Sequence, residues 1–252
     1  MFEKPISPGV QLLVFVCLYL FTWFLGGLII AIYVLVSSET PTAEFDITEP
    51  KTLLFSVFVT QTVNFLFAFW LFLKFTGQKF SEVVALNRKF KTNSFFIVIA
   101  IFLLAMPAMW GLSIINEALR ELMPTSALLD SEEVMNLAQK RLLEDSGVGR
   151  LLLTLLVIAL LPAIAEKIIF RGLLMGRLIT ATGSVHFAVL ISSLIFAGLH
   201  FQPLKLLPMV FLAMCLGYVY HYFKDLKYSM LLHFLINASQ IVVFFFWGKS
   251  FD

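Results

Sequence analysis

Long apolar runs separated by short polar segments make up most of the chain. The runs cover residues 9–36, 53–75, 94–116, 149–180, 184–202, 204–222 and 228–247. A membrane-spanning helix needs roughly 20 apolar residues, and inside lipid the backbone of each segment must satisfy its own hydrogen bonds. The runs lack the alternation of polar and apolar residues that is typical of a barrel strand. The pattern therefore predicts an all-α, polytopic transmembrane helical bundle of about seven or eight spans.

The composition narrows the class of protein further. Hydrophobic residues make up 60% of the chain and charged residues 13%, against roughly 25% charged residues in ordinary soluble domains. We therefore expect residues 1–252 to form a single membrane domain with the lipid bilayer as its partner. The net charge is only +2, and the basic residues form no stripe, so a nucleic-acid partner is not expected.

The charges between the runs predict the orientation in the membrane. Residues 39–51 carry four acids against one lysine, whereas residues 74–91 carry five basic residues against one acid. Because cytoplasmic connections are enriched in Lys and Arg, we expect the second connection and the N-terminus to be cytoplasmic. The first run is too long for the apolar part of a signal peptide, so we expect it to be a retained span. The expected location is the cell (inner) membrane.

One connection, residues 117–148, is long and mixed in charge. Val134, Leu137, Ala138 and Leu142 recur within it at helical spacing. This spacing predicts an amphipathic helix, which we expect to lie on the outer surface of the membrane.

Charged residues inside the fourth run are the first functional candidates. The segment LLPAIAEKIIFRGLL places Glu166, Lys167 and Arg171 well inside a long apolar helix. An ionised side chain at the centre of a span costs roughly 2.5–3.5 kcal/mol on insertion scales, which points to a function. Lys167 and Arg171 lie four residues apart on one helix face. They should repel each other unless one or both extend to the membrane interface.

Two later runs carry side chains with complementary chemistry. FAGLHFQP places Phe196 and His200 on one helix face, and HFLIN places His233 and Asn237 one turn apart. Such residues in a span can simply bond a neighbouring helix. Stacked donors can also stabilise a developing oxyanion. If these residues converge with Glu166, the set can hydrolyse a bond, because a carboxylate can take a proton from water held by an imidazole.

Together these residues resemble the motifs of the CAAX protease and bacteriocin-processing (CPBP) family of glutamic intramembrane endopeptidases, also called the Abi family. The family pattern is a Glu-Glu pair followed after three residues by Arg, then Phe with His four later, then His with Asn four later. Here the positions read Glu166, Lys167 and Arg171, then Phe196 and His200, then His233 and Asn237. The motif core lies within residues 149–247.

The resemblance implies a set of roles and a substrate class. In this family Glu166 and His200 would activate water, and His233 and Asn237 would form the oxyanion site. Lys167, Arg171 and Phe196 would support them. Such enzymes cleave peptide bonds inside or beside the membrane, including the bond after a prenylated cysteine. The implied substrate is a membrane-associated peptide or protein, with or without a lipid, and no cofactor is expected.

Lys167 departs from the family pattern, which has Glu at this position. A Glu there would pair with Arg171 one turn later, whereas Lys replaces attraction with repulsion. The sequence thus leaves open an impaired protease, and also a catalytically silent scaffold or immunity protein of the same fold. One Glu and two His could instead ligate zinc, although no HExxH motif is present. A transporter is a further alternative.

The depth of His233 raises a geometric difficulty for a shared site. His233 lies only a few residues into the last run, so it should be shallower than Glu166 and His200. Convergence would need strong tilt, or fifth and sixth runs that do not fully cross around Pro203 and Pro208. Because hydrolysis needs water, we expect a cavity open to the cytoplasm or laterally to lipid.

Overall fold

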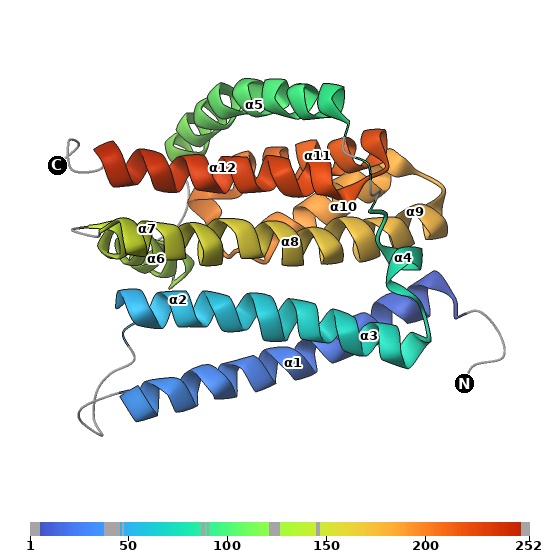
Figure 1. The fold of residues 1–252 in the computed structure, drawn as a ribbon, viewed down its shortest axis with the longest axis horizontal. Coiled ribbons are helices and arrows are strands. Elements are labelled where there is room, and N and C mark those ends of the chain that lie inside the picture. The colour runs from blue at the N-terminus through green and yellow to red at the C-terminus, as the bar shows by residue number, and fades with distance from the viewer. Residues whose placement is uncertain are drawn as a thin grey trace. The chain divides into compact units, whose positions relative to one another are not determined.

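Helices account for all the regular structure that is described. The computed structural model describes residues 6–37, 46, 48–86, 89, 91–120, 127–144 and 147–247. Every regular element in these ranges is a helix (Figure 1), which confirms the predicted all-α class. Five charged residues of the predicted connections lie outside the described residues, namely Glu39, Glu44, Arg88, Glu121 and Asp145.

Six of the apolar runs form helices that could cross a membrane. Within the described ranges, the helices with sufficient length and apolar composition are Pro8–Ser37, Pro50–Thr76, Thr92–Ala118, Val148–Thr182, Pro203–Phe223 and Leu226–Trp247. Their elements in chain order are α1 (Pro8–Ser37), α2 (Pro50–Val59), η1 (Thr60–Phe67), α3 (Ala68–Thr76), α5 (Thr92–Ala118), α7 (Val148–Thr154), η3 (Leu155–Leu160), α8 (Leu161–Lys167), η4 (Ile168–Met175), α9 (Gly176–Thr182), η5 (Pro203–Lys205), α11 (Leu206–Phe223) and α12 (Leu226–Trp247). The remaining helices are α4 (Phe80–Val83), α6 (Ala127–Leu143) and α10 (Val185–Gly198).

The fifth apolar run is shorter than predicted. It forms α10, which has 14 residues. At 1.5 Å per residue this helix is about 21 Å long, less than the hydrocarbon core of roughly 30 Å. The described chain therefore contains six full-length candidate spans rather than about seven or eight, because this run ends as a helix at Gly198.

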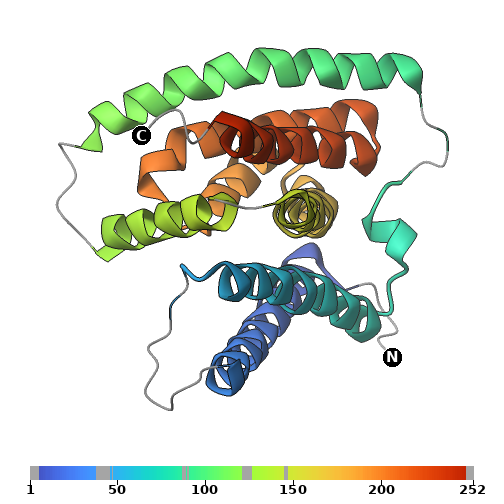
Figure 2. The ribbon, with the colours of Figure 1, turned by 60° about the vertical axis from the view of Figure 1, so that its left-hand side comes forward.

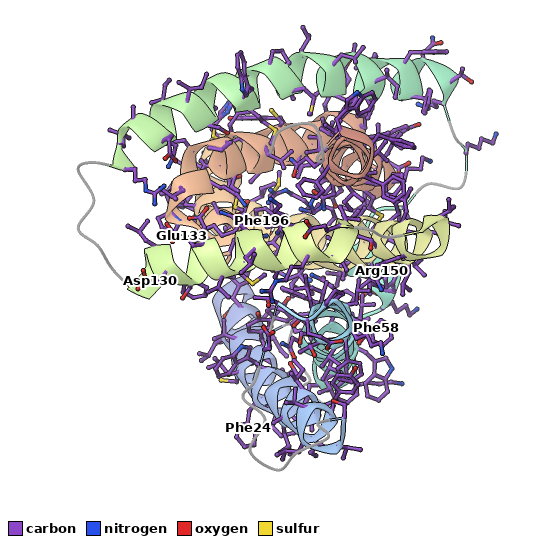
Figure 3. All side chains as sticks on the ribbon, turned by 90° about the vertical axis from the view of Figure 1, so that its left-hand side faces the viewer. Phe24, Phe58, Asp130, Glu133, Arg150 and Phe196 are labelled. Carbon is purple, nitrogen blue, oxygen red and sulfur yellow. The ribbon has the colours of Figure 1, made fainter. Side chains whose placement is uncertain are left out.

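The outer faces of the long helices carry large apolar side chains. Phe24 on α1 and Phe58 on α2, both labelled in Figure 3, expose 68% and 47% of their surface. Leu104 and Trp110 on α5 expose 73% and 70%. Exposed apolar area of this kind is unusual for a monomer in water. Lipid tails are as apolar as these side chains, so the exposure fits helices that lie in a bilayer.

The chain divides into two compact units. The first unit comprises Met1–Lys79, Val134–Glu166 and Asn237–Asp252, and the second comprises Phe80–Glu133 and Lys167–Ile236. Each unit takes segments from both halves of the sequence. Three of the four boundaries fall inside helices α6, α8 and α12, so consecutive motif residues such as Glu166 and Lys167 belong to different units.

In the first unit, α1 packs closely against η1. A Cβ added at Gly26 would lie 2.3 Å from Oδ1 of Asn64. The Thr22 hydroxyl lies 3.0 Å from the Tyr19 carbonyl oxygen of its own helix and 3.4 Å from the Asn64 carbonyl oxygen, so its one proton is shared between them. Figure 2 shows α1, in blue, crossing the cyan helix formed by α2, η1 and α3. Only a residue without a side chain allows this close approach at Gly26, which fixes the position of η1.

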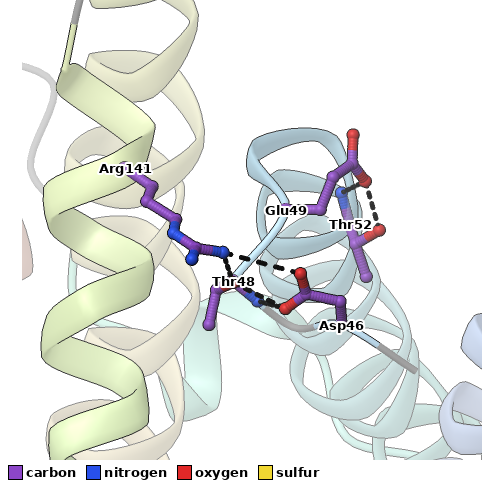
Figure 4. Close-up of polar contacts among 5 residues, drawn as sticks. All are labelled: Asp46, Thr48, Glu49, Thr52 and Arg141. Atoms are coloured by element: carbon purple, nitrogen blue, oxygen red, sulfur yellow. Dashed lines mark hydrogen bonds and ion pairs between the residues drawn. The ribbon is translucent and has the colours of Figure 1, made fainter. Parts of the chain in front are cut away.

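The predicted amphipathic helix within residues 117–148 is confirmed as α6. Its apolar face is only partly buried, since Ala138 and Leu142 are buried whereas Val134 and Leu137 remain exposed. Arg141 donates to the Thr48 hydroxyl and lies 3.6 Å from Asp46 (Figure 4). Hydrogen bonds from Thr48 and the charge of Arg141 hold the pKa of Asp46 below its ordinary value. These contacts join α6 to the start of α2.

The second unit has a core formed by α5, α11 and α12. Its buried members are Val98, Leu212, Leu216, Val219, Tyr228, Leu232 and Ile236. Helix α10 approaches α11 closely, since a Cβ added at Gly217 would lie 3.1 Å from Val189 Cγ1. This packing positions α10, which carries Phe196 near its end.

Candidate active site

The first motif lies on a long helix with two widened stretches. Residues 148–182 form one continuous helical segment in which η3 and η4 are π-helical. Glu166 and Lys167 end α8, between these two stretches, and Arg171 lies in η4. Segments of π-helix are rare, and they occur frequently at functional sites because the extra residue in a turn re-aims the side chains.

Lys167 and Arg171 both lie inside the second unit and face the same aromatic ring. Each is 0% exposed. The Lys167 Nζ lies 4.1 Å from the centroid of the Phe196 ring, and Arg171 Cζ lies 5.9 Å from it. The alternative that these cations extend to the membrane interface is therefore wrong. The attraction of both cations to the ring face offsets part of their mutual repulsion.

Arg171 is also bound by two groups of neighbouring helices. Its Nη2 donates to the Ala213 carbonyl oxygen of α11 at 2.7 Å, and its Nη1 donates to the Ser192 hydroxyl of α10 at 3.2 Å. A buried guanidinium needs such acceptors because it loses its water shell. Arg171 thereby links η4, α10 and α11.

Phe196 is the centre of the motif residues in the second unit. Its ring centroid lies 4.6 Å from that of His200 and 6.2 Å from that of His233. Phe170 packs against it edge-on at 5.0 Å. The second unit thus brings both motif histidines and both motif cations to one phenyl ring, whose position on α10 is labelled in Figure 3.

The His200 ring has a defined tautomer when it is neutral. His200 follows the last turn of α10, and its Nδ1 lies 2.8 Å from the Phe196 carbonyl oxygen. A carbonyl oxygen only accepts hydrogen bonds, so Nδ1 carries the proton. The lone pair then lies on Nε2, which can accept a hydrogen bond from water.

Two buried polar residues hold the turn that follows His200. The Asn116 amide donates to the Pro203 carbonyl oxygen at 2.8 Å and accepts from the Leu207 N–H at 2.9 Å. The Glu132 carboxylate accepts from the Leu204 N–H at 2.8 Å. These bonds satisfy N–H groups at the beginning of a helix that have no partner within it. Neither Asn116 nor Glu132 was among the predicted site residues, since nothing in their spacing relates them to His200.

Glu166 has a polar contact within the first unit. Its Oε1 accepts a hydrogen bond from the Gln61 side-chain amide at 3.1 Å. Both side chains are 6% exposed. Gln61 lies in η1, outside residues 149–247, which carry the three motifs, and it was not among the predicted site residues. Its only signal in the sequence is a polar amide inside an apolar run.

Asn237 and His233 lie one turn apart on α12, as the spacing predicts. His233 is 4% exposed. The Asn237 amide nitrogen lies 3.4 Å from the Ile158 carbonyl oxygen, within the first unit. In the described part of the chain, no group of three or more His, Cys, Asp or Glu side chains is placed to hold a metal ion.

Replacing Gly172 with alanine should destabilise the protein, because Gly172 packs closely against the C-terminal end of α4. An added Cβ would lie 3.2 Å from Val84 Cγ2 and 3.3 Å from the Val83 carbonyl oxygen, whereas Gly176 has open space. The Gly176→Ala variant has the same gain in helix propensity, but its added Cβ meets no neighbouring atom and causes no crowding. We expect Gly172→Ala to be less stable than Gly176→Ala by about 1–3 kcal/mol, measured by unfolding in mixed micelles. Equal stabilities would contradict the close packing.

A comparison with protein families identifies the C-terminal part of the chain. The family model described as type II CAAX prenyl endopeptidase Rce1-like matches residues 148–239. No curated protein and no solved structure gives a significant match. The matched segment contains every motif residue from Glu166 to Asn237.

The family match agrees with the resemblance seen in the three motifs. Type II CAAX prenyl endopeptidases are proteases, and the six long apolar helices in the described ranges fit an integral membrane protein. Residues 148–239 therefore match the Rce1-like family of type II CAAX prenyl endopeptidases, which supports the assignment of this segment to the CAAX protease and bacteriocin-processing (Abi) family.

Proposed function

We propose that the chain is an intramembrane endopeptidase in which Glu166 takes a proton from a water molecule held by His200. The water oxygen attacks the carbonyl carbon of a peptide bond, and His233 and Asn237 donate hydrogen bonds to the oxyanion that forms. The C–N bond then breaks, and Glu166 passes its proton to the leaving amine. The products are a carboxylate and a free amine.

The observation that carries this proposal is the family match, which includes all four residues at the motif spacing. Two features of the residues support it. Glu166 and His233 are buried within long apolar helices, where ionisable groups are functional by default. The Nε2 lone pair of neutral His200 suits it to hold water.

The proposed substrate is a membrane-associated peptide or protein, with or without a lipid group. We propose catalysis without a metal ion, because Lys167 and Arg171 face the same ring as the two histidines and would repel a dication near them. The proposed orientation places the N-terminus in the cytoplasm of a cell whose inner membrane holds the protein. A cavity open to the cytoplasm or to lipid would supply the water.

Protein termini in membranes test this function. Mass spectrometry would compare cells that make the parent chain with cells that make the Glu166→Ala variant. We expect a set of new termini in the parent that disappears in Glu166→Ala, because alanine cannot accept a proton. Identical termini in both membranes would contradict the proposal.

A second candidate function is a catalytically silent membrane protein of the same fold, and Lys167 favours it. A buried ammonium group stands where the family has a carboxylate. If this charge silences the enzyme, Lys167→Glu should restore the attraction to Arg171 and produce termini that the parent lacks. We expect an increase of about tenfold or more if the positions of Glu166 and Arg171 depend on that pair. Unchanged termini in a cleaving parent would show that Lys167 is a tolerated variation.

A further inference from the structure

Gln61 is a polar side chain buried in the second apolar helix of the chain. The run around it reads VFVTQTVNFLFAFW. An amide placed inside such a run loses its hydrogen bonds with water, so it must find a partner in the protein. The Gln61 side-chain nitrogen donates to Glu166 Oε1 at 3.1 Å. The proposed base is therefore contacted from a helix that lies outside the matched segment 148–239.

The segment that carries Gln61 packs closely against α1. Gln61 lies at the start of the π-helical segment η1, and Asn64 lies three residues later in the same segment. Asn64 packs against α1, where its side chain lies close to Gly26 and its carbonyl oxygen lies 3.4 Å from the Thr22 hydroxyl. A donor on such a support can hold its acceptor in one orientation. Helices α1 and η1 thus form a scaffold for the amide that meets Glu166.

We propose that Gln61 is a positioning residue that orients the Glu166 carboxylate for catalysis. This inference rests on the proposed function, in which Glu166 accepts the proton of water. Gln61 itself does not touch the substrate. The N-terminal helices then contribute to the active site, although the family motifs lie in the C-terminal part of the chain.

The role of Gln61 is tested with Gln61→Met, which keeps the length of the side chain and removes the donor. The probe is a quenched fluorescent peptide that ends in a farnesylated cysteine and three further residues, cleaved by purified protein in liposomes. We expect kcat to fall by about 10- to 100-fold with KM unchanged, because misorientation of a catalytic group affects the chemical step. Gln61→Asn keeps an amide on a shorter side chain and should recover part of this loss.

Thr62→Val serves as the matched control. Thr62 lies in the same segment, and among the described residues its hydroxyl bonds only to carbonyl oxygens of its own helix, those of Phe58 and Val59. We expect this variant to retain the parent kcat and unfolding midpoint. If Gln61→Met fails to fold, the Gln61→Asn variant tests the positioning role instead. A kcat below that of the parent at an unchanged unfolding midpoint would then support the role.

The outcomes separate the inference from the function on which it rests. Loss of cleavage in Glu166→Gln together with a normal kcat in Gln61→Met and Gln61→Asn would overturn the positioning role alone. A Glu166→Gln variant as fast as the parent would overturn the proposed base. If neither the parent nor Lys167→Glu cleaves this peptide, and neither produces membrane termini that depend on Glu166, the proposed protease activity and the inference with it would be overturned.

Discussion

Purified protein with Glu166 replaced by glutamine is expected to cleave a membrane-associated substrate at least about 100-fold, and up to about 10⁴-fold, more slowly than the parent. Glutamine has nearly the shape of glutamate, but its amide cannot take a proton from water. The change therefore removes the general base while leaving the packing of α8 almost intact. The measurement is the initial rate of cleavage in liposomes, beside the unfolding midpoint of each protein.

Glu144→Gln provides the control for this substitution. Glu144 is an exposed acid that follows α6, so its replacement changes the net charge equally without touching the proposed site. We expect its rate to match the parent rate. A Glu166→Gln protein that is folded and cleaves normally would remove Glu166 from the mechanism. Equal losses in both variants would mean that charge, rather than the Glu166 base, sets the rate.

Replacing Arg171 with methionine is expected to lower the free energy of unfolding by about 2–4 kcal/mol. Methionine fills much of the same space but cannot bond the Ala213 carbonyl oxygen or the Ser192 hydroxyl, both of which are bound by Arg171. Loss of a buried partner costs roughly 1–3 kcal/mol for each group left without one. Relief of the repulsion from Lys167 returns part of this cost. Unfolding in mixed micelles would measure the difference.

Arg150→Met is the matched control for Arg171. Arg150 lies near the start of the same long helical segment, is exposed, and is labelled in Figure 3. We expect its loss to change the stability by less than about 0.5 kcal/mol, as is usual for surface positions. Should Arg171→Met be as stable as Arg150→Met, the buried hydrogen bonds of Arg171 would contribute nothing to the fold.

The helical class and the motif residues follow from the sequence because membrane proteins obey a strict local rule. A backbone in lipid has to bond within its own segment, so each apolar run had to be a helix, and the described helices match the predicted runs closely. Charged side chains are costly in these runs, which made Glu166 and Arg171 visible as candidate functional residues. Spacing on a single helix also placed His233 and Asn237 one turn apart.

The partners of these residues were decided only by the tertiary structure. Periodicity says which residues share a face, but it does not say which helix that face meets. Lys167 could therefore have extended to the interface, yet it lies against the Phe196 ring, which is on another helix. Likewise, α10 stops at Gly198 within a run whose apolar pattern continues, so the sequence overestimated the number of full-length spans.

The same limit explains why Gln61 was missed. An amide in an apolar run carries no motif, and the sequence separation of 105 between Gln61 and Glu166 hides their contact from any local pattern. The sequence by itself determined the membrane class, the helices and the residues able to do chemistry, because these depend on local hydrophobicity and spacing. Packing between distant helices determined which donor meets Glu166 and which ring receives Lys167, because such contacts depend on how whole helices fit together.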